Sequence, residues 1–249
     1  MSEQVSKSCA EGVCELRFDR PEKRNAITLR MYQALAAHLH AALADQAVRA
    51  VLLSGAGASF SAGNDLNDFL TGPEFTSAHP AMDVLRTLAT FDKPLVAAVH
   101  GPTIGIGVTM LLHCDLVVAA QGTQLLMPFV ALGLVPEAGS SLLLPRLVGQ
   151  QRAAELLLLG QPLDATEAQR LGLVNRVVEA DKLLEEARSL AQRLAQQPQD
   201  ALRATKRLLR GDAAEVLARI EAEAQVFGAQ LKSEEFRAQV RAVLARGRG

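Results

Sequence analysis

Residues 50–66 read Ala-Val-Leu-Leu-Ser-Gly-Ala-Gly-Ala-Ser-Phe-Ser-Ala-Gly-Asn-Asp-Leu, an apolar run followed at once by a loop of small residues. The run at 50–54 is typical of a short buried strand. In the loop, the small side chains let the backbone approach a ligand closely and present N–H groups to it. The segment therefore predicts a strand that leads into a backbone-lined binding loop.

The same pattern recurs along the chain. Residues 94–99 and 115–119 predict further buried strands, and 101–107 form a second glycine-rich loop that runs into an apolar helix at 108–112. Residues 13–18 alternate apolar and polar side chains, as in a strand, and Thr28 is placed to cap a helix that follows. Strands that alternate with helices at this spacing along the chain indicate a largely parallel, layered α/β domain.

The C-terminal part has a different character. From Asp181 onward, Ala, Leu, Glu, Gln and Arg recur at helical spacing, with a break at Gln197-Pro198-Gln199. This pattern predicts three or four helices, suited to covering a ligand site or an oligomer interface.

Composition and charge exclude several classes of protein. The 249 residues carry 26 Lys and Arg against 27 Asp and Glu, which argues against a nucleic-acid binder. Neither a signal peptide nor a membrane-spanning run is visible, so we expect a cytoplasmic enzyme without a membrane partner. The three cysteines are sparse and odd in number, which favours free thiols in a reducing compartment.

Known cofactor and metal motifs do not fit. A dinucleotide fingerprint that starts at Gly55 would need glycine where Phe60 stands, and the P-loop and G-x-S-x-G patterns are missing. The histidines form no metal-binding pattern, so no metal site is expected.

Two loops and one carboxylate could carry chemistry. N–H groups from the loops at 61–65 and 101–107 could converge on one oxygen and form an oxyanion hole. Glu137, between Pro136 and Ala138, is either a helix N-terminal residue favoured by the helix dipole or a base in an apolar cleft. The residues alone leave both interpretations open.

Several motifs, in order, resemble those of the enoyl-CoA hydratases and isomerases, the crotonase superfamily. Phe60-Ser-Ala-Gly-Asn-Asp-Leu66 resembles the family's F-x-A-G-x-D signature, and Arg20 to Ile27 resembles its first CoA-binding segment. The stretch from Lys93 to Gly101 resembles the strand that enters the second oxyanion loop, and the resemblance covers about residues 10–210. It implies a crotonase-like (ClpP/crotonase) spiral of repeated ββα units with a C-terminal α-helical extension. We expect a catalytic core at 1–195 and a helical region at 196–249 for trimerisation and active-site cover.

The resemblance also implies roles for individual residues. The amides of Asn64 and Ile106 would hold the thioester oxygen of an acyl-CoA, and Asp65 would brace its loop. Lys206 would reach a CoA phosphate from a neighbouring subunit of a homotrimer or dimer of trimers, or would simply be a solvated helix lysine. Coenzyme A is part of the substrate, so no separate cofactor is expected. The implied substrate-binding residues are Lys23, Arg24, Ala26, Ala62, Gly63, Asp65, Leu66, Gly105, Phe129, Leu132 and Lys206.

Departures from the family pattern indicate the reaction. The two glutamates with which the hydratases activate water would fall at Thr109 and Phe129, and neither side chain can move the protons that hydration requires. Glu137 falls where the Δ3,Δ2-enoyl-CoA isomerases of the family carry their acid/base carboxylate. The sequence thus predicts isomerisation of 3-enoyl-CoA to trans-2-enoyl-CoA. The alternatives are another reaction of the family on an acyl-CoA, hydration or ring isomerisation, and an acyl-CoA-binding protein without turnover.

Overall fold

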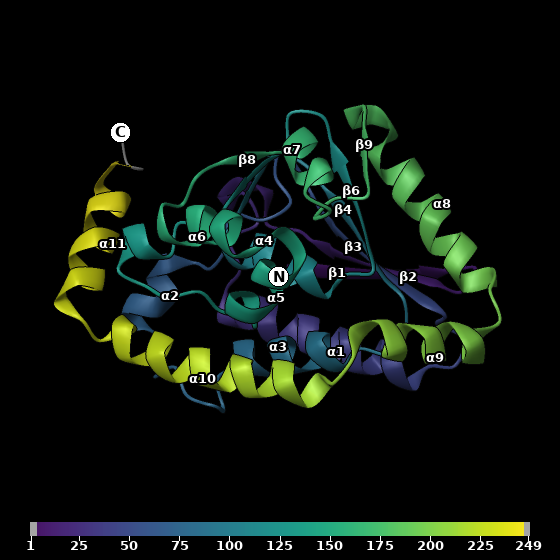
Figure 1. Ribbon diagram of the computed structural model, residues 1–249, viewed down its shortest axis with the longest axis horizontal. Coiled ribbons are helices and arrows are strands. Elements are labelled where there is room, and N and C mark those ends of the chain that lie inside the picture. Colours follow the sequence, from purple (N-terminus) through teal and green to yellow (C-terminus); the bar gives the residue numbers. More distant parts are fainter. Residues whose placement is uncertain (1–3, 247–249) are drawn as a thin grey trace.

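The computed structural model describes residues 4–246 and has the layered α/β architecture that the sequence predicted (Figure 1). A six-stranded sheet has the order β1-β2-β3-β4-β6-β9. Its first two strands form an antiparallel hairpin, and every other neighbouring pair is parallel. The strands are β1 (Val5–Ala10), β2 (Val13–Phe18), β3 (Ala50–Gly55), β4 (Leu95–Val99), β6 (Leu116–Ala120) and β9 (Arg176–Val178).

A second, three-stranded sheet accounts for the spiral. It contains β5 (Pro102–Ile104), β7 (Gln124–Leu126) and β8 (Leu163–Asp164). The chain passes from β4 directly into β5 and from β6 into β7, so that successive turns contribute one strand to each sheet. After β3, Ser61 makes a bridge to Thr103 of β5 and continues the same pattern. The resulting course is a spiral of ββα units, as the resemblance implies.

The central strands β3, β4 and β6 are buried on both faces of the large sheet, which explains why they are continuous apolar runs. In β3, Val51 and Leu53 face the side covered by α1 (Leu29–Ala44) and α3 (Pro80–Thr90). Leu52 faces the other side, which α8 (Leu183–Gln196) covers. Thr28 caps α1 as predicted, because its Oγ1 accepts a hydrogen bond from Met31 N at 3.2 Å.

α-Helices of four to sixteen residues connect the strands, and the described C-terminal part is made of helices. Four helices follow Asp181, and the first of them ends at Gln196, where the sequence predicted a break. Figure 1 shows α10 (Ala213–Leu231) running along the lower edge of the molecule, and it packs against α3 and α5 (Ser140–Val148). The remaining elements are η1 (Pro21–Lys23), α2 (Leu66–Thr71), α4 (Ile106–Thr109), η2 (Met110–His113), η3 (Val130–Leu132), α6 (Gln150–Leu158), α7 (Ala165–Arg170), η4 (Ala180–Lys182), α9 (Gln199–Arg210) and α11 (Glu234–Arg246).

The hairpin corrects one prediction. Cys9 and Cys14 are joined by a disulfide bond, although the sequence favoured free thiols. The reason is the tight turn at Glu11 and Gly12, which makes the two cysteines direct partners across the strands. Cys114 stays a free thiol, and burial raises its pKa to about 12.

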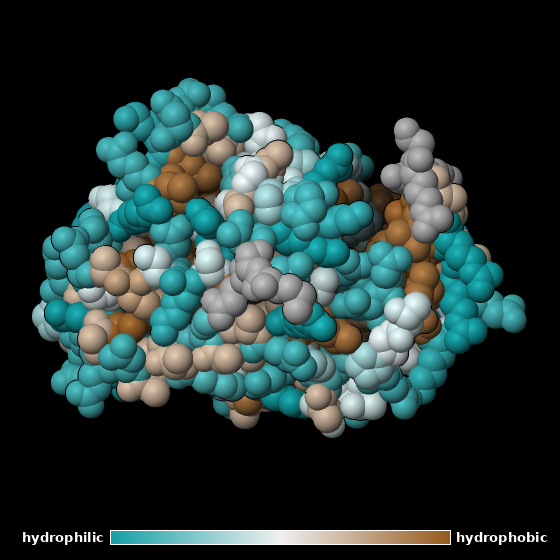
Figure 2. All heavy atoms as spheres, turned by 180° about the vertical axis from the view of Figure 1, so that it is seen from behind, coloured by the Kyte–Doolittle hydropathy of each residue, from teal (hydrophilic) through white to brown (hydrophobic). Residues whose placement is uncertain are grey.

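The surface seen from behind is mainly hydrophilic, with hydrophobic residues gathered beside α11 at the right of the view (Figure 2). α11 packs against η3, the short helix between Phe129 and Gly133. Within residues 4–246, no helix is both long and apolar enough to cross a membrane.

Candidate active site

The structure brings the two predicted oxyanion loops into direct contact. Ile104 N donates to Ser61 O at 2.9 Å, next to the bridge between Ser61 and Thr103. Gly63 has a φ of +86°, and a Cβ there would lie 2.8 Å from Ile104 O. This position therefore requires glycine both for its backbone conformation and for the close approach of the loops.

Two backbone N–H groups in these loops, those of Asn64 and Ile106, have no hydrogen-bond acceptor among the described residues. The flanking groups Gly63 O and Asp65 N are both hydrogen-bonded to Ile27, whereas the N–H of Asn64 has no acceptor among residues 4–246. Ile106 begins α4 after Gly105, whose φ is +54°, and its N–H also lacks an acceptor in this part of the chain. First-turn amides of a helix are open donors unless something caps them.

The predicted CoA-binding segment lies beside the first loop. Ala62 N donates to Arg24 O at 2.8 Å, and Lys23 and Arg24 are exposed. Asn25, which the sequence analysis missed, is fully buried and donates through Nδ2 to Ser59 O at 2.7 Å. The residue type could have indicated the structural role of Asn25, because asparagine tolerates a left-handed backbone. The φ of Asn25 is 56°.

Asp65 holds the loop in place. Its Oδ2 accepts from Arg20 at 2.6 Å and its Oδ1 accepts from Asn67 N at 3.0 Å, so it caps α2. Burial raises the pKa of this carboxyl, but the hydrogen bonds from Arg20 and Asn67 outweigh burial and bring the pKa below its usual value. With both oxygens engaged, Asp65 supports the loop, and the half-buried Leu66 then begins α2.

Glu137 is buried beside α4. Its side chain is 4% exposed, and Oε1 accepts a hydrogen bond from Thr109 Oγ1 at 3.0 Å. Burial raises the pKa of Glu137 to about 8; the Thr109 hydroxyl lowers it in part, and the charge of Glu223 raises it further. Since Thr109 and Ile106 are the two ends of the same short helix, the carboxylate and the free Ile106 amide belong to one site.

Tyr32 also reaches this site and was missed as a site residue. It lies on the buried face of α1, and its hydroxyl donates to Asn64 Oδ1 at 2.5 Å. Burial, followed by the negative charge of Glu137, raises the pKa of the phenol well above its usual value. Tyr32 could have been recognised from the sequence as a tyrosine within the apolar stripe of a helix, because a buried hydroxyl needs a hydrogen-bond partner.

Apolar residues border the same region. Phe129 is buried and precedes η3, which ends at the half-buried Leu132. Leu134 N donates to Phe129 O at 2.8 Å, so the chain turns back toward Glu137 over a short distance. In the described residues, no three His, Cys, Asp or Glu side chains form a group that could hold a metal ion.

Lys206 does not have one of its two predicted roles, that of a solvated helix lysine. It is 6% exposed, pairs with Asp115 Oδ2 at 2.6 Å and donates to Lys93 O. Its contact with a CoA phosphate from a neighbouring subunit stays a prediction. Burial lowers the pKa of Lys206 to about 8. The sequence could not show this, because Lys206 and Asp115 meet only through the packing of α9 on the sheet.

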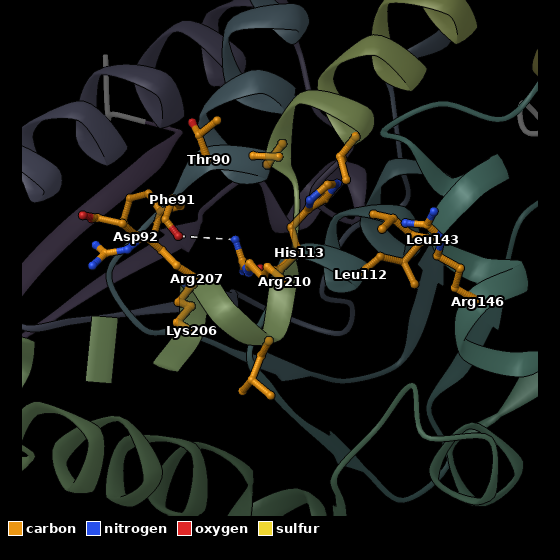
Figure 3. A pocket seen from close by; sticks show the side chains of 15 residues that line it. Thr90, Phe91, Asp92, Leu112, His113, Leu143, Arg146, Lys206, Arg207 and Arg210 are labelled. Atoms are coloured by element: carbon orange, nitrogen blue, oxygen red, sulfur yellow. Dashed lines mark hydrogen bonds between the residues drawn. The ribbon is translucent and has the colours of Figure 1, made fainter. Parts of the chain in front are cut away.

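A cavity of about 580 Å³ lies beside Lys206, at the junction of α9 and α10. In Figure 3 the side chains of Arg207, Arg210 and His113 surround it, and Arg210 donates to Phe91 O at 3.3 Å. Lys206 is the one predicted site residue in its lining, so this cavity is separate from the Asn64 and Glu137 region.

The site thus combines two free amide donors with a carboxylate of raised pKa. Such donors can stabilise negative charge on an oxygen. A carboxylate whose pKa lies near neutrality can accept and return a proton at physiological pH. This set of groups fits proton transfer next to a carbonyl group.

Comparisons with known proteins identify the family of the chain. A family model described as "Enoyl-CoA hydratase/isomerase" matches residues 8–247. The 1,2-epoxyphenylacetyl-CoA isomerase of Escherichia coli is 38% identical over 80% of this chain and 78% of its own length. Enoyl-CoA delta isomerase 2 of Rattus norvegicus is 38% identical over 90% of this chain, which spans only 59% of that protein. The structure of Pseudomonas aeruginosa OdaA has a TM-score of 0.94 at 42% identity, over 97% of this chain and 99% of that one. The chain therefore belongs to the enoyl-CoA hydratase/isomerase family and has its crotonase fold.

Proposed function

We propose that this protein is a Δ3,Δ2-enoyl-CoA isomerase, which moves the double bond of a 3-enoyl-CoA into conjugation with the thioester carbonyl. The observation that carries the proposal is the buried carboxylate of Glu137, with a pKa of about 8, in one site with the free amides of Asn64 and Ile106. Because Thr109 occupies only Oε1 of Glu137, the other oxygen is available to take a proton.

The mechanism needs one base that acts twice. Ionised Glu137 removes a proton from C2, and the electron pair moves onto the thioester oxygen to give a dienolate. The amides of Asn64 and Ile106 donate hydrogen bonds to that oxygen, each contributing about 3–4 kcal/mol. Protonated Glu137 then delivers the proton to C4, and the double bond ends between C2 and C3. No atom is gained or lost, and Glu137 is regenerated.

Hydration is disfavoured by the residues at the two positions where the resemblance implies hydratase glutamates. Adding water needs one group to take a proton from water and another to protonate carbon. Thr109 donates its hydroxyl to Glu137, and Phe129 has no titratable group. The rat relative's name, which specifies a delta isomerase, supports the same reading.

Coenzyme A fits the proposal as part of the substrate. Lys23 and Arg24 are exposed beside the first oxyanion loop, where two cations would meet the phosphates of the nucleotide. No separate cofactor enters the proposed reaction.

Substitution of the base tests the proposal. In Glu137→Gln, kcat for 3-enoyl-CoA isomerisation should fall at least about 10²-fold, because the amide cannot accept the C2 proton. In the wild type, kcat/KM should rise with pH up to about 8, where Glu137 becomes ionised, and then level off. The measurement is the absorbance of the conjugated product across pH, and acyl-CoA binding by calorimetry is the control.

Two results would contradict the proposal. Isomerisation by Glu137→Gln at the wild-type rate would show that another group is the base. Hydration of 2-enoyl-CoA by the wild type as fast as isomerisation would identify the protein as a hydratase instead.

A further inference from the structure

A second buried carboxylate, Glu223, lies on the apolar face of α10. Val216, Ile220 and Phe227 form this face at helical spacing, and Glu223 stands between them at 7% exposure. A buried carboxylate is costly unless it is hydrogen-bonded, so Glu223 must have strong partners.

Those partners are the first amides of α5. Glu223 Oε2 accepts from Gly139 N at 2.6 Å, and Oε1 accepts from Ser141 N at 2.9 Å. No side chain of the preceding loop caps α5, so Glu223 takes that role from a distant helix. A negative charge at this end is also favoured by the helix dipole.

The loop that Glu223 holds is the one that carries Glu137, and it is strained. Ala138 and Gly139 have φ values of 63° and 71°. A left-handed alanine is uncommon and persists only where its surroundings enforce it. Here His113 Nε2 donates to Ala138 O at 2.7 Å, and Ser140 Oγ donates to Glu137 O at 2.6 Å.

We propose that Glu223 is a positioning residue for Glu137, through which α10 fixes the loop at 137–141 and places a negative charge beside the base. This inference rests on the proposed role of Glu137. Both oxygens of Glu223 are occupied by amides of α5, so Glu223 is not itself the acid or base.

The charge of Glu223 is one cause of the raised pKa of Glu137. The other titratable groups around the two carboxylates come from three elements. Burial keeps Tyr32 of α1 neutral by raising its pKa, and burial lowers the pKa of His113 of η2 to about 4, so that both are uncharged near pH 8. Arg219 of α10 is exposed and donates to Ser141 Oγ at 3.3 Å. Burial raises the pKa of Glu223 itself, and the hydrogen bonds from Ser141 and Gly139 and the charge of Arg219 partly offset that effect and favour its ionised form. Of these groups, Glu223 is the one whose negative charge opposes ionisation of Glu137.

The test compares Glu223→Gln with Glu221→Gln, the same chemical change two residues away. Glu221 pairs with Arg86 at 2.6 Å and is 40% exposed, so its removal should leave Glu137 unaffected. Two measurements are made on each full-length variant. Carbon-13 NMR of the labelled glutamate carboxyls follows the titration of Glu137, with Glu137→Gln assigning its signal, and kcat is measured with a 3-enoyl-CoA.

In Glu223→Gln, the titration midpoint of Glu137 should fall below the wild-type value of about 8, because a negative neighbour is lost. The kcat should fall about ten- to a hundredfold, because a displacement of the base of about 1 Å costs that much. Glu221→Gln should match the wild type in both measurements. An unchanged midpoint in Glu223→Gln would overturn the proposal.

Glu223→Asp keeps the test decisive if Glu223→Gln does not fold. It retains the charge but withdraws the carboxylate by one methylene, so kcat should fall while the Glu137 midpoint stays near that of the wild type. A wild-type kcat in Glu223→Asp would overturn the proposal. If the wild type lacks isomerase activity, the proposed function fails, and the NMR titration still decides whether Glu223 acts on Glu137.

Discussion

At the scale of single residues, Thr109 has two effects on this site. It stands where a hydratase-like glutamate was expected and found missing, and its hydroxyl is the hydrogen-bond donor to Glu137 at 3.0 Å. This bond stabilises the ionised form of Glu137 and partly offsets burial, which raises its pKa. Threonine in place of glutamate at position 109 therefore has two consequences: the site lacks a second carboxylate, and the pKa of the remaining carboxylate, Glu137, is lowered by the threonine hydroxyl.

Thr109→Val removes this hydroxyl while nearly conserving the shape of the side chain. Without the donor, ionised Glu137 is less stable, so its pKa should rise, by about one unit for a hydrogen bond to a charged group. The rising limb of the plot of kcat/KM against pH should therefore shift to higher pH, and kcat/KM at pH 7 should fall. Thr109→Ser, which keeps a hydroxyl, should follow the wild-type profile. Coincident profiles for Thr109→Val and the wild type would refute a role for the hydroxyl.

At the scale of elements, the oxyanion hole depends on how closely two loops approach. β3 and β4 are neighbours in the sheet, and their following loops are tied together by the bond from Ile104 N to Ser61 O. Gly63 lies at the contact, where a Cβ would meet Ile104 O at 2.8 Å. The spacing of the two donors is thus set by backbone contacts between loops.

Gly63→Ala should separate these loops and displace the Asn64 amide. Loss of one oxyanion donor lowers kcat by about 10²–10³-fold, and we expect a fall of that size in isomerase activity. Gly122→Ala is the matched control, because its φ of +79° carries the same backbone strain and a Cβ there would meet nothing within 4 Å. Thermal unfolding should show the cost of the left-handed backbone in both variants, with a further cost in Gly63→Ala from the loop contact, and steady-state kinetics should show a loss of activity in Gly63→Ala alone. Equal activity in both would contradict the importance of the loop contact.

At the scale of the whole molecule, the sequence predicted those strands and helices whose positions follow from a local pattern of apolar and polar residues. The apolar runs at 50–54, 94–99 and 115–119 predicted β3, β4 and β6, because a parallel strand buried on both faces must be apolar throughout. The motifs that follow the first two of these strands led to Asn64 and Ile106, and the stretch at 134–141 led to Glu137. The boundary between residues 195 and 196 and the predicted trimer or dimer of trimers stay predictions.

What the sequence did not predict depends on contacts between distant segments. Glu223 meets the Glu137 loop only because α10 packs on α5, although a glutamate in an apolar stripe was a visible signal. Cys9 and Cys14 needed the hairpin register, and Lys206 needed α9 to lie against the sheet. In each case, a polar or reactive side chain found a partner that periodicity cannot reveal.

The attachment of α9 to the sheet gives the last prediction. Asp115, at the start of β6, pairs with Lys206 at 2.6 Å and Arg210 at 3.3 Å and also accepts from Leu95 N of β4 at 2.7 Å. Removal of its charge leaves a buried ammonium without its carboxylate, which typically costs several kcal/mol. Asp115→Asn should therefore lower the free energy of unfolding by about 3 kcal/mol in a urea titration.

The matched control is Glu185→Gln, which breaks the exposed pair of Glu185 with Lys182. An exposed pair contributes about 0–1 kcal/mol, so this variant should unfold close to the wild-type midpoint. Because Lys206 is 6% exposed while Lys182 is 62% exposed at its side chain, the two variants separate the effect of burial from that of losing an ion pair. If Asp115→Asn is no less stable than Glu185→Gln, the contacts of α9 with Asp115 do not stabilise the C-terminal helices, and the other polar contacts of α9, those of Arg203 with Asp92 and of Arg210 with Phe91 O, must hold it in place.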